Sequence, residues 1–266
     1  MENSQQGANA SHRPAKSEQT QESAMEVLGI DIGGSGVKGA PVDSLTGTLT
    51  RERLRIPTPQ PATPKAIATV VKDIVEHFGW KGKVGCGFPA IVQNGVVKSA
   101  ANISPKWINK NAEQLFNEKA GCTTVVKNDA DAAALAEMHF GAGKDQNGLT
   151  LLITVGTGLG TALFYDGKLI PNMEFGHVLL KNKIAEHYTS DAVRKKNDLS
   201  WPEWSTRFNT YLEHLERLLS PELFIIGGGA SKKFNKIQPH LKVQTPVKPA
   251  TLLNNAGIIG AAMAAK

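Results

Sequence analysis

Apolar residues and glycines follow the same order at two distant places along the chain. Residues 27–32 form a continuous apolar strand, residues 33–36 ("GGSG") form a turn, and residues 37–42 form a returning strand. Residues 151–164, "LLITVGTGLGTALF", repeat this order of apolar run, glycine tip and apolar run. Short apolar runs bounded by turn residues are typical of buried β-strands. The pattern predicts two glycine-tipped hairpins, and the second indicates a domain that repeats the first.

Helical periodicity appears between and after the two hairpins. Apolar residues recur every three or four positions between Pro64 and Gly79, which predicts a helix that starts at the proline and ends at the glycine. Strands are predicted at "TGTLTRERLRIPTP", "KVGCGFP", "GVVKSA", "TTVVK" and "ELFIIGG". Further helices are predicted over residues 112–120, 131–140, 185–196 and 203–219, near residue 233, and over residues 252–265. The alternation of strands and helices indicates mixed α/β sheets.

Composition narrows the class of protein. We expect a disordered tail over residues 1–26, because this polar segment has no apolar stretch that could pack or serve as a signal-peptide core. The longest uncharged run, residues 149–165, is rich in Gly and Thr and is better explained as two strands than as a membrane span. Cys86 and Cys122 form no CxxC pattern, which argues against a disulfide framework or a thiolate metal site. A reducing cytoplasm suits this cysteine usage.

The charge of the chain favours an anionic partner. A formal net charge of +6 and a pI near 9.2 fit nucleic acid, nucleotide and polyphosphate alike. Residues 231–250 hold five lysines and no acid, and a solvated basic face explains such a stretch as well as an anion-binding track does. Residues 194–196, "RKK", are a second candidate track.

The glycine tips carry a more specific signal. Glycines at a strand-to-strand tip leave backbone N–H groups exposed, and no Cβ keeps an anion away from them. One such tip, "DIGGSG", is more often a plain hairpin turn. Two tips, each after an apolar strand and the first preceded by Asp31, favour phosphate binding. Neither tip matches GxxxxGK[ST] or stands at a strand-to-helix turn, so a P-loop and a Rossmann fingerprint are disfavoured.

Six motifs occur in an order that matches a known family: "DIGGSGVK", "NISPKW", "VVKNDADAAALAE", "TVGTGLG", "EFGH" and "EHYTS". Together they resemble the superfamily of actin, sugar kinases and heat-shock chaperone ATPases, and within it the ROK family of bacterial sugar kinases and repressors. The resemblance implies an actin-like (ribonuclease H-like) two-domain α/β fold with duplicated mixed sheets and an interdomain cleft. It places a small N-terminal domain at residues 27–128 and 251–266, and a larger C-terminal domain at residues 129–250.

One departure from the family pattern concerns zinc. Many members carry a Cys-rich zinc site, CxCGxxGC, between the EFGH-like motif and the next Glu, whereas the interval here, "VLLKNKIA", holds no cysteine. We therefore expect no structural zinc, and His177 must be oriented by other contacts. The short interval, with "AANISPKW" and "PVDSLTGTL", resembles the subgroup of polyphosphate glucokinases, some of which also accept ATP and mannose.

The resemblance assigns a role to each motif. Asp129 becomes the base that accepts the proton of a sugar hydroxyl, and Asp31 is expected to hold Mg²⁺ through water. Without the resemblance, Asn128 or Asp129 is explained as the N-cap of a helix, and Asp131 as a first-turn charge that complements the helix dipole. One residue can act both as base and as cap. The further roles implied are sugar contacts by Asn102, Asn128, Glu174, His177 and Glu186; phosphate contacts by Asp31, Gly33, Gly34, Ser35, Gly36, Lys38, Thr157, Gly158 and Gly160; and nucleotide or polyphosphate contacts by Gly228, Gly229, Lys232, Lys233 and Lys236.

Three classes of function compete for these motifs. A sugar kinase needs a base, a divalent cation and a cleft. A ROK repressor needs a helix-turn-helix ahead of the sugar domain, and only the polar segment precedes Val27 here. A filament-forming or chaperone ATPase has no need of "EFGH" together with "EHYTS". A surface turn with exposed charges would explain Glu186 equally well. The motifs as an ordered set favour the sugar kinase.

We predict a cytoplasmic glucokinase that uses inorganic polyphosphate or ATP, with Mg²⁺, to phosphorylate the 6-hydroxyl of glucose, and of mannose in addition. An ATP-only ROK hexose or N-acylhexosamine kinase is the first alternative. A non-enzymatic sugar-sensing regulator without its DNA-binding domain is the second. We expect no nucleic-acid or membrane partner, and a homodimer is left open.

Overall fold

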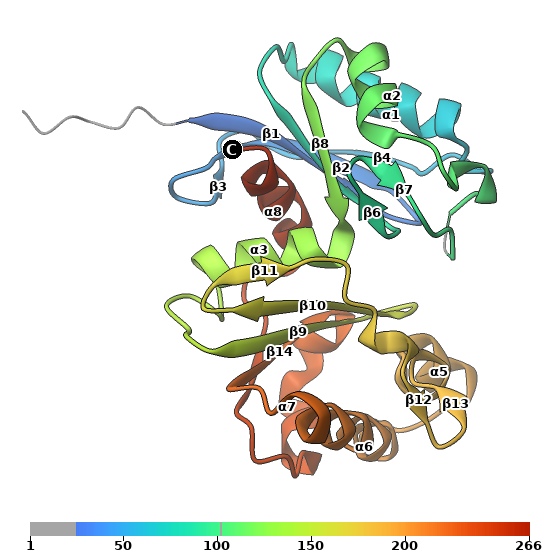
Figure 1. The fold of residues 1–266 in the computed structure, drawn as a ribbon, viewed down its shortest axis with the longest axis vertical. Coiled ribbons are helices and arrows are strands. Elements are labelled where there is room, and N and C mark those ends of the chain that lie inside the picture. The colour runs from blue at the N-terminus through green and yellow to red at the C-terminus, as the bar shows by residue number, and fades with distance from the viewer. Residues whose placement is uncertain (1–24, 102) are drawn as a thin grey trace, which may run out of the picture.

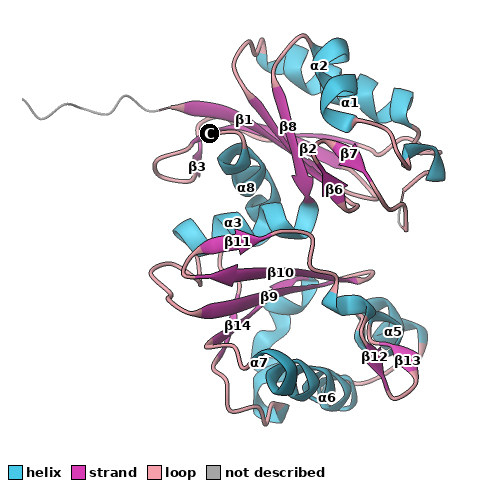
Figure 2. Cartoon of the chain, viewed as in Figure 1, coloured by secondary structure: helices cyan, strands magenta, loops and turns pink. Residues whose placement is uncertain are grey.

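Two mixed β-sheets lie one above the other in the computed structural model, which describes residues 25–101 and 103–266 (Figures 1 and 2). The first sheet has the strand order β3-β2-β1-β5-β8, with β4 also paired to β2, and the second has the order β11-β10-β9-β14-β15. In each order the first three strands are antiparallel and the last two add in parallel. The two halves share one topology, which confirms the predicted duplication of mixed sheets.

Each sheet is built around a hairpin of two seven-residue strands. β1 (Glu26–Ile32) pairs with β2 (Val37–Asp43), and β9 (Leu149–Val155) pairs with β10 (Leu159–Tyr165). Pairing runs over the full length of these strands, and their interior positions are buried because they are apolar or small. Both predicted hairpins are therefore confirmed, with the glycine tips at their turns.

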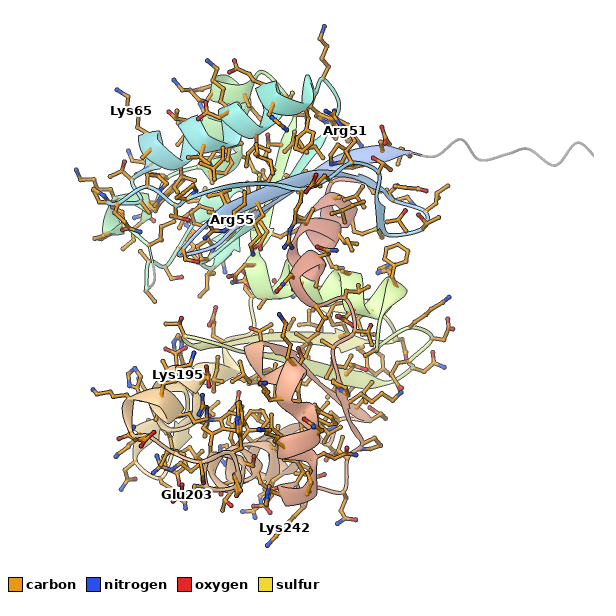
Figure 3. The ribbon with its side chains drawn as sticks, turned by 180° about the vertical axis from the view of Figure 1, so that it is seen from behind. Arg51, Arg55, Lys65, Lys195, Glu203 and Lys242 are labelled. Atoms are coloured by element: carbon orange, nitrogen blue, oxygen red, sulfur yellow. The ribbon has the colours of Figure 1, made fainter. Side chains whose placement is uncertain are left out.

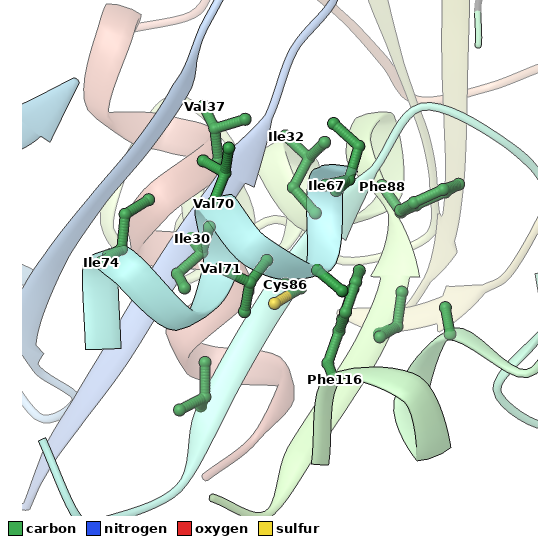
Figure 4. Close-up of a cluster of buried hydrophobic side chains, with 14 of the residues drawn as sticks. Ile30, Ile32, Val37, Ile67, Val70, Val71, Ile74, Cys86, Phe88 and Phe116 are labelled. Atoms are coloured by element: carbon green, nitrogen blue, oxygen red, sulfur yellow. The ribbon is translucent and has the colours of Figure 1, made fainter. Parts of the chain in front are cut away.

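Two helices cover one face of the first sheet (Figure 2). They are α1 (Pro64–Phe78) and α2 (Ala112–Ala120), and Gly79 and Gly121 end them in left-handed backbone as predicted. Figure 4 shows the core that α1 forms with β1 and β5. The other strands of this half are β3 (Thr48–Leu49), β4 (Leu54–Ile56), β5 (Val84–Phe88), β6 (Val92–Gln93), β7 (Val96–Val97) and β8 (Thr124–Asn128).

The second sheet has its own core, which packs against the long helix α6 (Trp201–Leu219). Ser200 caps this helix and Glu203 completes a capping box, so the helix starts two residues before the predicted position. Trp204 and Phe208 of α6 are fully buried against the sheet. The other elements of this half are β11 (Lys168–Ile170), β12 (Leu179–Leu180), β13 (Lys183–Ile184), α4 (Glu186–Thr189), α5 (Asp191–Lys196), β14 (Leu223–Gly228), α7 (Phe234–Ile237) and β15 (Val247–Pro249).

Helices α3 (Asp129–Phe140) and α8 (Ala256–Ala264) lie together between the two sheets (Figure 1). Their backbones approach closely at Gly260, where a Cβ would lie 1.5 Å from the carbonyl oxygen of Ala132. Helix α3 contacts β5 and β8 of the first sheet and β10 of the second. Because α3 packs against both sheets, the predicted domain boundary at residue 129 stays a prediction.

Three further predicted element bounds are wrong, and caps explain two of them. Helix α3 begins at Asp129 rather than Asp131, because the Asn128 side chain caps it. The helix predicted over residues 185–196 is split into α4 and α5 at Ser190, whose side chain caps α5. The last α-helix begins at Ala256, after a short 3-10 helix over Leu253–Asn255 in which Leu253 has left-handed backbone. Within the described residues, no helix has both the length and the apolar character needed to cross a membrane.

Candidate active site

Two cavities meet between the sheets. The larger has a volume of about 610 Å³ and is lined by both glycine tips, by the end of β8 and by the segment that follows β11. The smaller has a volume of about 220 Å³ and lies against α3, α8 and the end of β14. Asp129, Thr154 and Gly228 line both cavities. A ligand that passes from one cavity to the other must therefore pass Asp129.

The two glycine tips face the larger cavity together. Gly34 and Ser35 of the first tip line it, as do Gly156, Thr157 and Gly158 of the second. Within the described residues, the backbone amides of Gly34, Ser35, Thr157 and Gly158 donate no hydrogen bond. Unused amides on two opposed loops can bind the oxygens of one anion from both sides. The predicted phosphate-binding tips are thus brought together by the fold.

The first tip is held open by its neighbours. The Gly33 amide donates to the Gly36 carbonyl over 3.1 Å, which closes the turn, and the Thr58 hydroxyl donates to the Gly33 carbonyl. Gly33 faces an adjoining cavity rather than the larger one. A Cβ at Gly36 would lie 2.7 Å from the Arg55 guanidinium, so a larger residue there would displace this side chain. Arg55 was missed from the sequence, although its alternation with Leu54 and Ile56 is typical of a strand with one exposed face.

Asp129 stands at the start of α3, between the two tips. Asn128 supplies the N-cap: its side-chain oxygen accepts hydrogen bonds from the amides of Ala130 (2.9 Å) and Asp131 (3.1 Å). Its side-chain amide donates to the Ala90 carbonyl over 3.2 Å, which ties the cap to the loop after β5. Because Asn128 does the capping, the Asp129 carboxylate is free to face the cavity. The cap therefore falls to Asn128, and the role of base stays a prediction for Asp129.

The protonation of Asp129 is tuned by its surroundings. Burial, together with the negative charges of Asp31 and Glu174, raises the pKa of Asp129 to about 7, while the Ala130 amide, which donates over 2.9 Å, opposes the shift. A carboxylate with a pKa near neutral is matched to accepting and returning protons at physiological pH. Strongly shifted carboxylates in a cleft are typical of catalytic groups.

The opposite wall of the larger cavity carries Glu174, His177 and Glu186. His177 Nδ1 lies 3.8 Å from a Glu174 carboxylate oxygen, and Glu186 accepts the Leu159 amide over 2.8 Å. Burial raises the pKa of Glu174, with His177 opposing and Glu186 adding to the shift. These groups offer several hydrogen-bond acceptors around an open space, which is the chemistry that binds a polyol. Asn102, predicted to join them, lies outside the described residues.

The smaller cavity collects charged groups from the first sheet. Asp31 and Lys38 face each other across β1 and β2, and their side chains are 3.2 Å apart. Gly257 of α8 makes room for this pair, since a Cβ there would lie 2.8 Å from the Asp31 carboxyl carbon. Gly228, whose φ is 69°, and Ser231 complete the wall at the end of β14. Thr154 and Ser231 were not predicted: Thr154 opens the motif "TVGTGLG" but was assigned no contact, and Ser231 belongs to none of the six motifs.

Apart from Gly228, the predicted nucleotide or polyphosphate residues of the second half lie outside the two cavities. Lys232, Lys233 and Lys236 are exposed and line neither cavity, and Gly229 is exposed next to Gly228. Gly160 faces the larger cavity, where a Cβ would lie 2.5 Å from the Thr154 hydroxyl. The lysines therefore remain a predicted track outside the cavities.

A further group missed from the sequence joins the two halves. The Asn172 side chain exchanges two hydrogen bonds with the backbone of Val92, each 3.1 Å long, and the Asn172 amide donates to Asp131 over 2.9 Å. Asp131 is buried, and its second carboxylate oxygen has no partner among the described residues. Burial raises the pKa of Asp131 to about 6. The only sequence signal was a polar residue between Pro171 and Met173, ahead of "EFGH".

Comparison with known proteins identifies the family. The model of the ROK family matches residues 27–196, and the chain belongs to this family. The chain is 48% identical over 238 residues to a polyphosphate glucokinase of Mycobacterium tuberculosis (strain CDC 1551 / Oshkosh), a match that covers 89% of this chain and 90% of that protein. The Mycobacterium leprae polyphosphate glucokinase is 44% identical over 89% of this chain and 74% of its own length.

Solved structures agree with this assignment. The inorganic polyphosphate/ATP-glucomannokinase of Arthrobacter sp. strain KM is 46% identical, with a TM-score of 0.86 over 90% of this chain and 97% of its own. A ROK family glucokinase of Streptomyces griseus, solved with glucose and AMPPNP, shares the fold with a TM-score of 0.79 at 24% identity, over 91% of this chain and 99% of that one. The predicted ROK membership and the actin-like two-domain α/β fold are confirmed.

Proposed function

We propose that this chain is a glucokinase that transfers the terminal phosphoryl group of inorganic polyphosphate, or of ATP, to the 6-hydroxyl of glucose, with mannose as a second acceptor. One observation carries the proposal: free amides of both glycine tips and the Asp129 carboxylate line a single cavity. The polyphosphate donor is supported by the names of the relatives at 44–48% identity.

The larger cavity suits the sugar. Glu174, His177 and Glu186 would accept and donate hydrogen bonds to its ring hydroxyls, and Asn128 would help to close the floor of the cavity. This arrangement leaves the 6-hydroxyl next to Asp129. Holding the attacking oxygen in line with the donor supplies much of the rate enhancement in phosphoryl transfer, because little covalent chemistry is left to the protein.

The reaction requires one proton transfer. As the O6–P bond forms and the bridging P–O bond of the donor breaks, Asp129 accepts the proton of the 6-hydroxyl, and the electron pair of the broken bond stays on the departing phosphate chain or ADP. The amides of the two tips stabilise the charge on the transferred group. The raised pKa of Asp129 keeps it able to release the proton again near pH 7.

The smaller cavity suits a magnesium ion with the donor phosphates. Mg²⁺ keeps most of its waters and needs only one or two protein carboxylates together with substrate phosphates. Asp31 offers one half-buried carboxylate in the cavity wall, and the described residues form no group of three or more acidic, His or Cys ligands. This donor set fits Mg²⁺ bound through water to Asp31, where it would neutralise phosphate charge.

A purified-enzyme assay tests the function. Glucose 6-phosphate formation should be measured with long-chain polyphosphate or ATP as donor, with and without Mg²⁺, against glucose, mannose and N-acetylmannosamine. We expect turnover of glucose with both donors. Turnover with ATP alone would favour an ATP-only ROK kinase, and sugar binding without turnover by either donor would favour a sugar-sensing protein.

A further inference from the structure

The cavities themselves cannot hold a long polyanion by charge. Asp31, Asp129 and Glu137 line the smaller cavity, and Lys38 is its single cation. The larger cavity adds Glu174 and Glu186 and contains no Lys or Arg. A phosphate chain that extends beyond the reacting end needs cations outside these cavities, because charge neutralisation dominates the binding of polyanions. The cations nearest to the phosphate tip therefore decide where the chain runs.

Arg55 is the cation that touches this tip. In the first sheet Arg55 lies directly opposite Lys38, which in turn lies opposite Asp31, so the three side chains share one face. Arg55 Nη2 donates to the Ser35 carbonyl over 2.8 Å, and its guanidinium covers Gly36. Figure 3 shows Arg55 on the first sheet, where this sheet faces the second half of the molecule.

Arg53 lies two residues before Arg55, just ahead of β4. Its Nη1 donates to the Asn255 side chain over 3.2 Å. Arg53 lines an open surface cavity of about 670 Å³, and Leu253 and Asn254 line both this cavity and the smaller one of the active site. The smaller cavity thus opens past Leu253 and Asn254 toward Arg53, which gives a phosphate chain an exit over the first sheet.

Neither arginine is neutralised by the protein. Within the described residues no carboxylate oxygen lies within 4.0 Å of Arg53 or Arg55, whereas Lys38 and Arg194 each have an acidic partner. Glu52 is the one acid that lines the surface cavity. Arg51 also lines this cavity, but its guanidinium already donates to the Phe78 carbonyl over 3.0 Å and packs on the Phe78 ring. Two adjacent guanidinium groups without counter-ions are typical of an anion-binding surface.

We propose that Arg55 and Arg53 form a track that binds the polyphosphate chain beyond the reacting end, over the first sheet. This inference rests on the proposed polyphosphate donor. ATP ends in a nucleoside after three phosphates and needs the track less. The lysine track predicted at Lys232, Lys233 and Lys236 lies at the other side of the cleft, so the two routes can be separated by mutation.

Direct binding tests the track without catalysis. Fluorescently labelled long-chain polyphosphate would be titrated against the full chain by anisotropy, in the wild type and in the Arg53→Gln/Arg55→Gln double variant. Lys65→Gln/Lys81→Gln is the matched control, because it removes the same charge from exposed positions that line no described cavity. We expect the arginine variant to bind polyphosphate at least tenfold more weakly, with a shallower dependence of affinity on salt. The lysine control should change the affinity less than twofold, because local contacts and not net charge would then determine binding.

Steady-state kinetics give the second readout. The arginine variant should lose about tenfold in kcat/KM for polyphosphate and less than threefold for ATP, since only the long chain reaches the track. Arg55→Lys, which keeps the charge but not the fork that binds Ser35, separates charge from support of the tip. Retained polyphosphate use in Arg55→Lys supports the track, and equal loss for both donors in this variant overturns it.

The outcomes for track and function differ. Unchanged polyphosphate binding in the arginine variant overturns the track, and so does a comparable loss confined to a Lys232→Ala/Lys233→Ala/Lys236→Ala variant. Glucose 6-phosphate formation from polyphosphate with unchanged binding leaves the proposed function standing. Arginine-dependent polyphosphate binding without any phosphoryl transfer supports the track and contradicts the proposed function. No polyphosphate binding by the wild type contradicts both.

Discussion

The two glycine hairpins match in backbone and differ in charge. Both have seven-residue strands in the same register, and both bury the same strand positions apart from the outer ends. The penultimate strand position before each tip is half-buried in both, and so is its partner across the hairpin. In the first hairpin these positions hold Asp31 and Lys38, and in the second they hold Thr154 and Gly160.

This difference divides the work of the site. The first hairpin brings a carboxylate, an ammonium group and Arg55 to the phosphate side of the cleft, while the second brings only backbone and a hydroxyl. Gly158 of the second tip instead packs on Glu186, where a Cβ would lie 2.2 Å from the carboxylate. The two hairpins thus share free backbone amides at their tips, which can bind any phosphate, and they differ in the side chains beside the tips. In the proposed reaction, the first half would face the charged donor and the second half would face the sugar.

The largest effect is expected at Asp129, where the two halves meet. Replacing Asp129 with Asn removes the base, so kcat should fall about 10²–10⁴-fold, while glucose binding measured by calorimetry changes little. Surface Asp73→Asn is the control. Near-normal turnover of the Asp129 variant would remove this residue from the mechanism.

The pH dependence of Tm shows whether the Asp129→Asn variant folds normally, because the pKa shift of Asp129 in the wild type fixes the sign of the expected change. The pKa of Asp129 rises from 3.8 to about 7 on folding, so the folded protein binds the proton more tightly than the unfolded chain. The contribution of Asp129 to stability therefore falls as pH rises through this window. Asp129→Asn should raise Tm at pH 8 and leave it nearly unchanged near pH 4. A lower Tm at pH 8 would point to a folding defect.

Matched glycine changes should separate donor from sugar. Gly158→Ala displaces Glu186, so KM for glucose should rise about tenfold, as expected for a lost charged hydrogen bond, with little change in KM for the donor. Gly36→Ala displaces Arg55, so KM for polyphosphate should rise instead. Gly34→Ala and Gly156→Ala add a Cβ to each tip without displacing a side chain, since nothing lies within 4 Å of a Cβ there, so they measure the effect of the Cβ alone. Equal effects on both substrates would show that the tips are not specialised.

The charge difference between the hairpins should appear in the pH profile. A base must be ionised, so kcat/KM should fall as pH drops below about 7, the pKa of Asp129. Asp31→Asn removes a like charge, which lowers the pKa of Asp129 and moves this acid limb to lower pH. Thr154→Val, the equivalent change in the second hairpin, should leave the limb in place. An acid limb that Asp31→Asn does not move would contradict this coupling.

The smallest effect is expected where the halves are tied together. Asn172→Gly keeps the left-handed backbone (φ 60°) but removes two hydrogen bonds to Val92, so unfolding in urea should cost about 1–2 kcal/mol less. KM for glucose should rise a few-fold, because Glu174 follows two residues later. Asn182→Gly, at an exposed position with the same φ of 60°, is the control. A similar loss in both variants would mean that the side chain of Asn172 does not matter.

Much of the fold could be predicted because it is encoded in local pattern. The two hairpins, α1 and α2 follow from apolar periodicity with Gly, Pro and capping residues at their ends. The strands β6 and β15 and the hairpin β12–β13 were missed, because segments of two or three residues carry too little pattern. The motif placed Asn128 in the site. Only the hydrogen-bond distances showed that Asn128, and not Asp129, is the N-cap of α3.

The candidate site divides in the same way. The order of the motifs indicated the ROK family and pointed to Asp129, Glu174 and Glu186. Arg55 and Asn172 belong to no motif and were found from contacts alone, and Thr154, although it opens "TVGTGLG", was recognised only from the cavities that it lines. The lysine-rich stretch at residues 231–250 is the opposite case: its charge is evident in the sequence, but its lysines line neither cavity.

The sequence by itself determined which segments form the hairpins and which family they belong to, because strand periodicity and motif order are local properties of the chain. Only the tertiary structure decided that both tips share one cavity with Asp129, that this carboxyl group has a pKa near neutrality, and that Arg55 covers the first tip. These properties depend on distances between residues far apart in the chain, and burial and Coulomb interactions act through those distances.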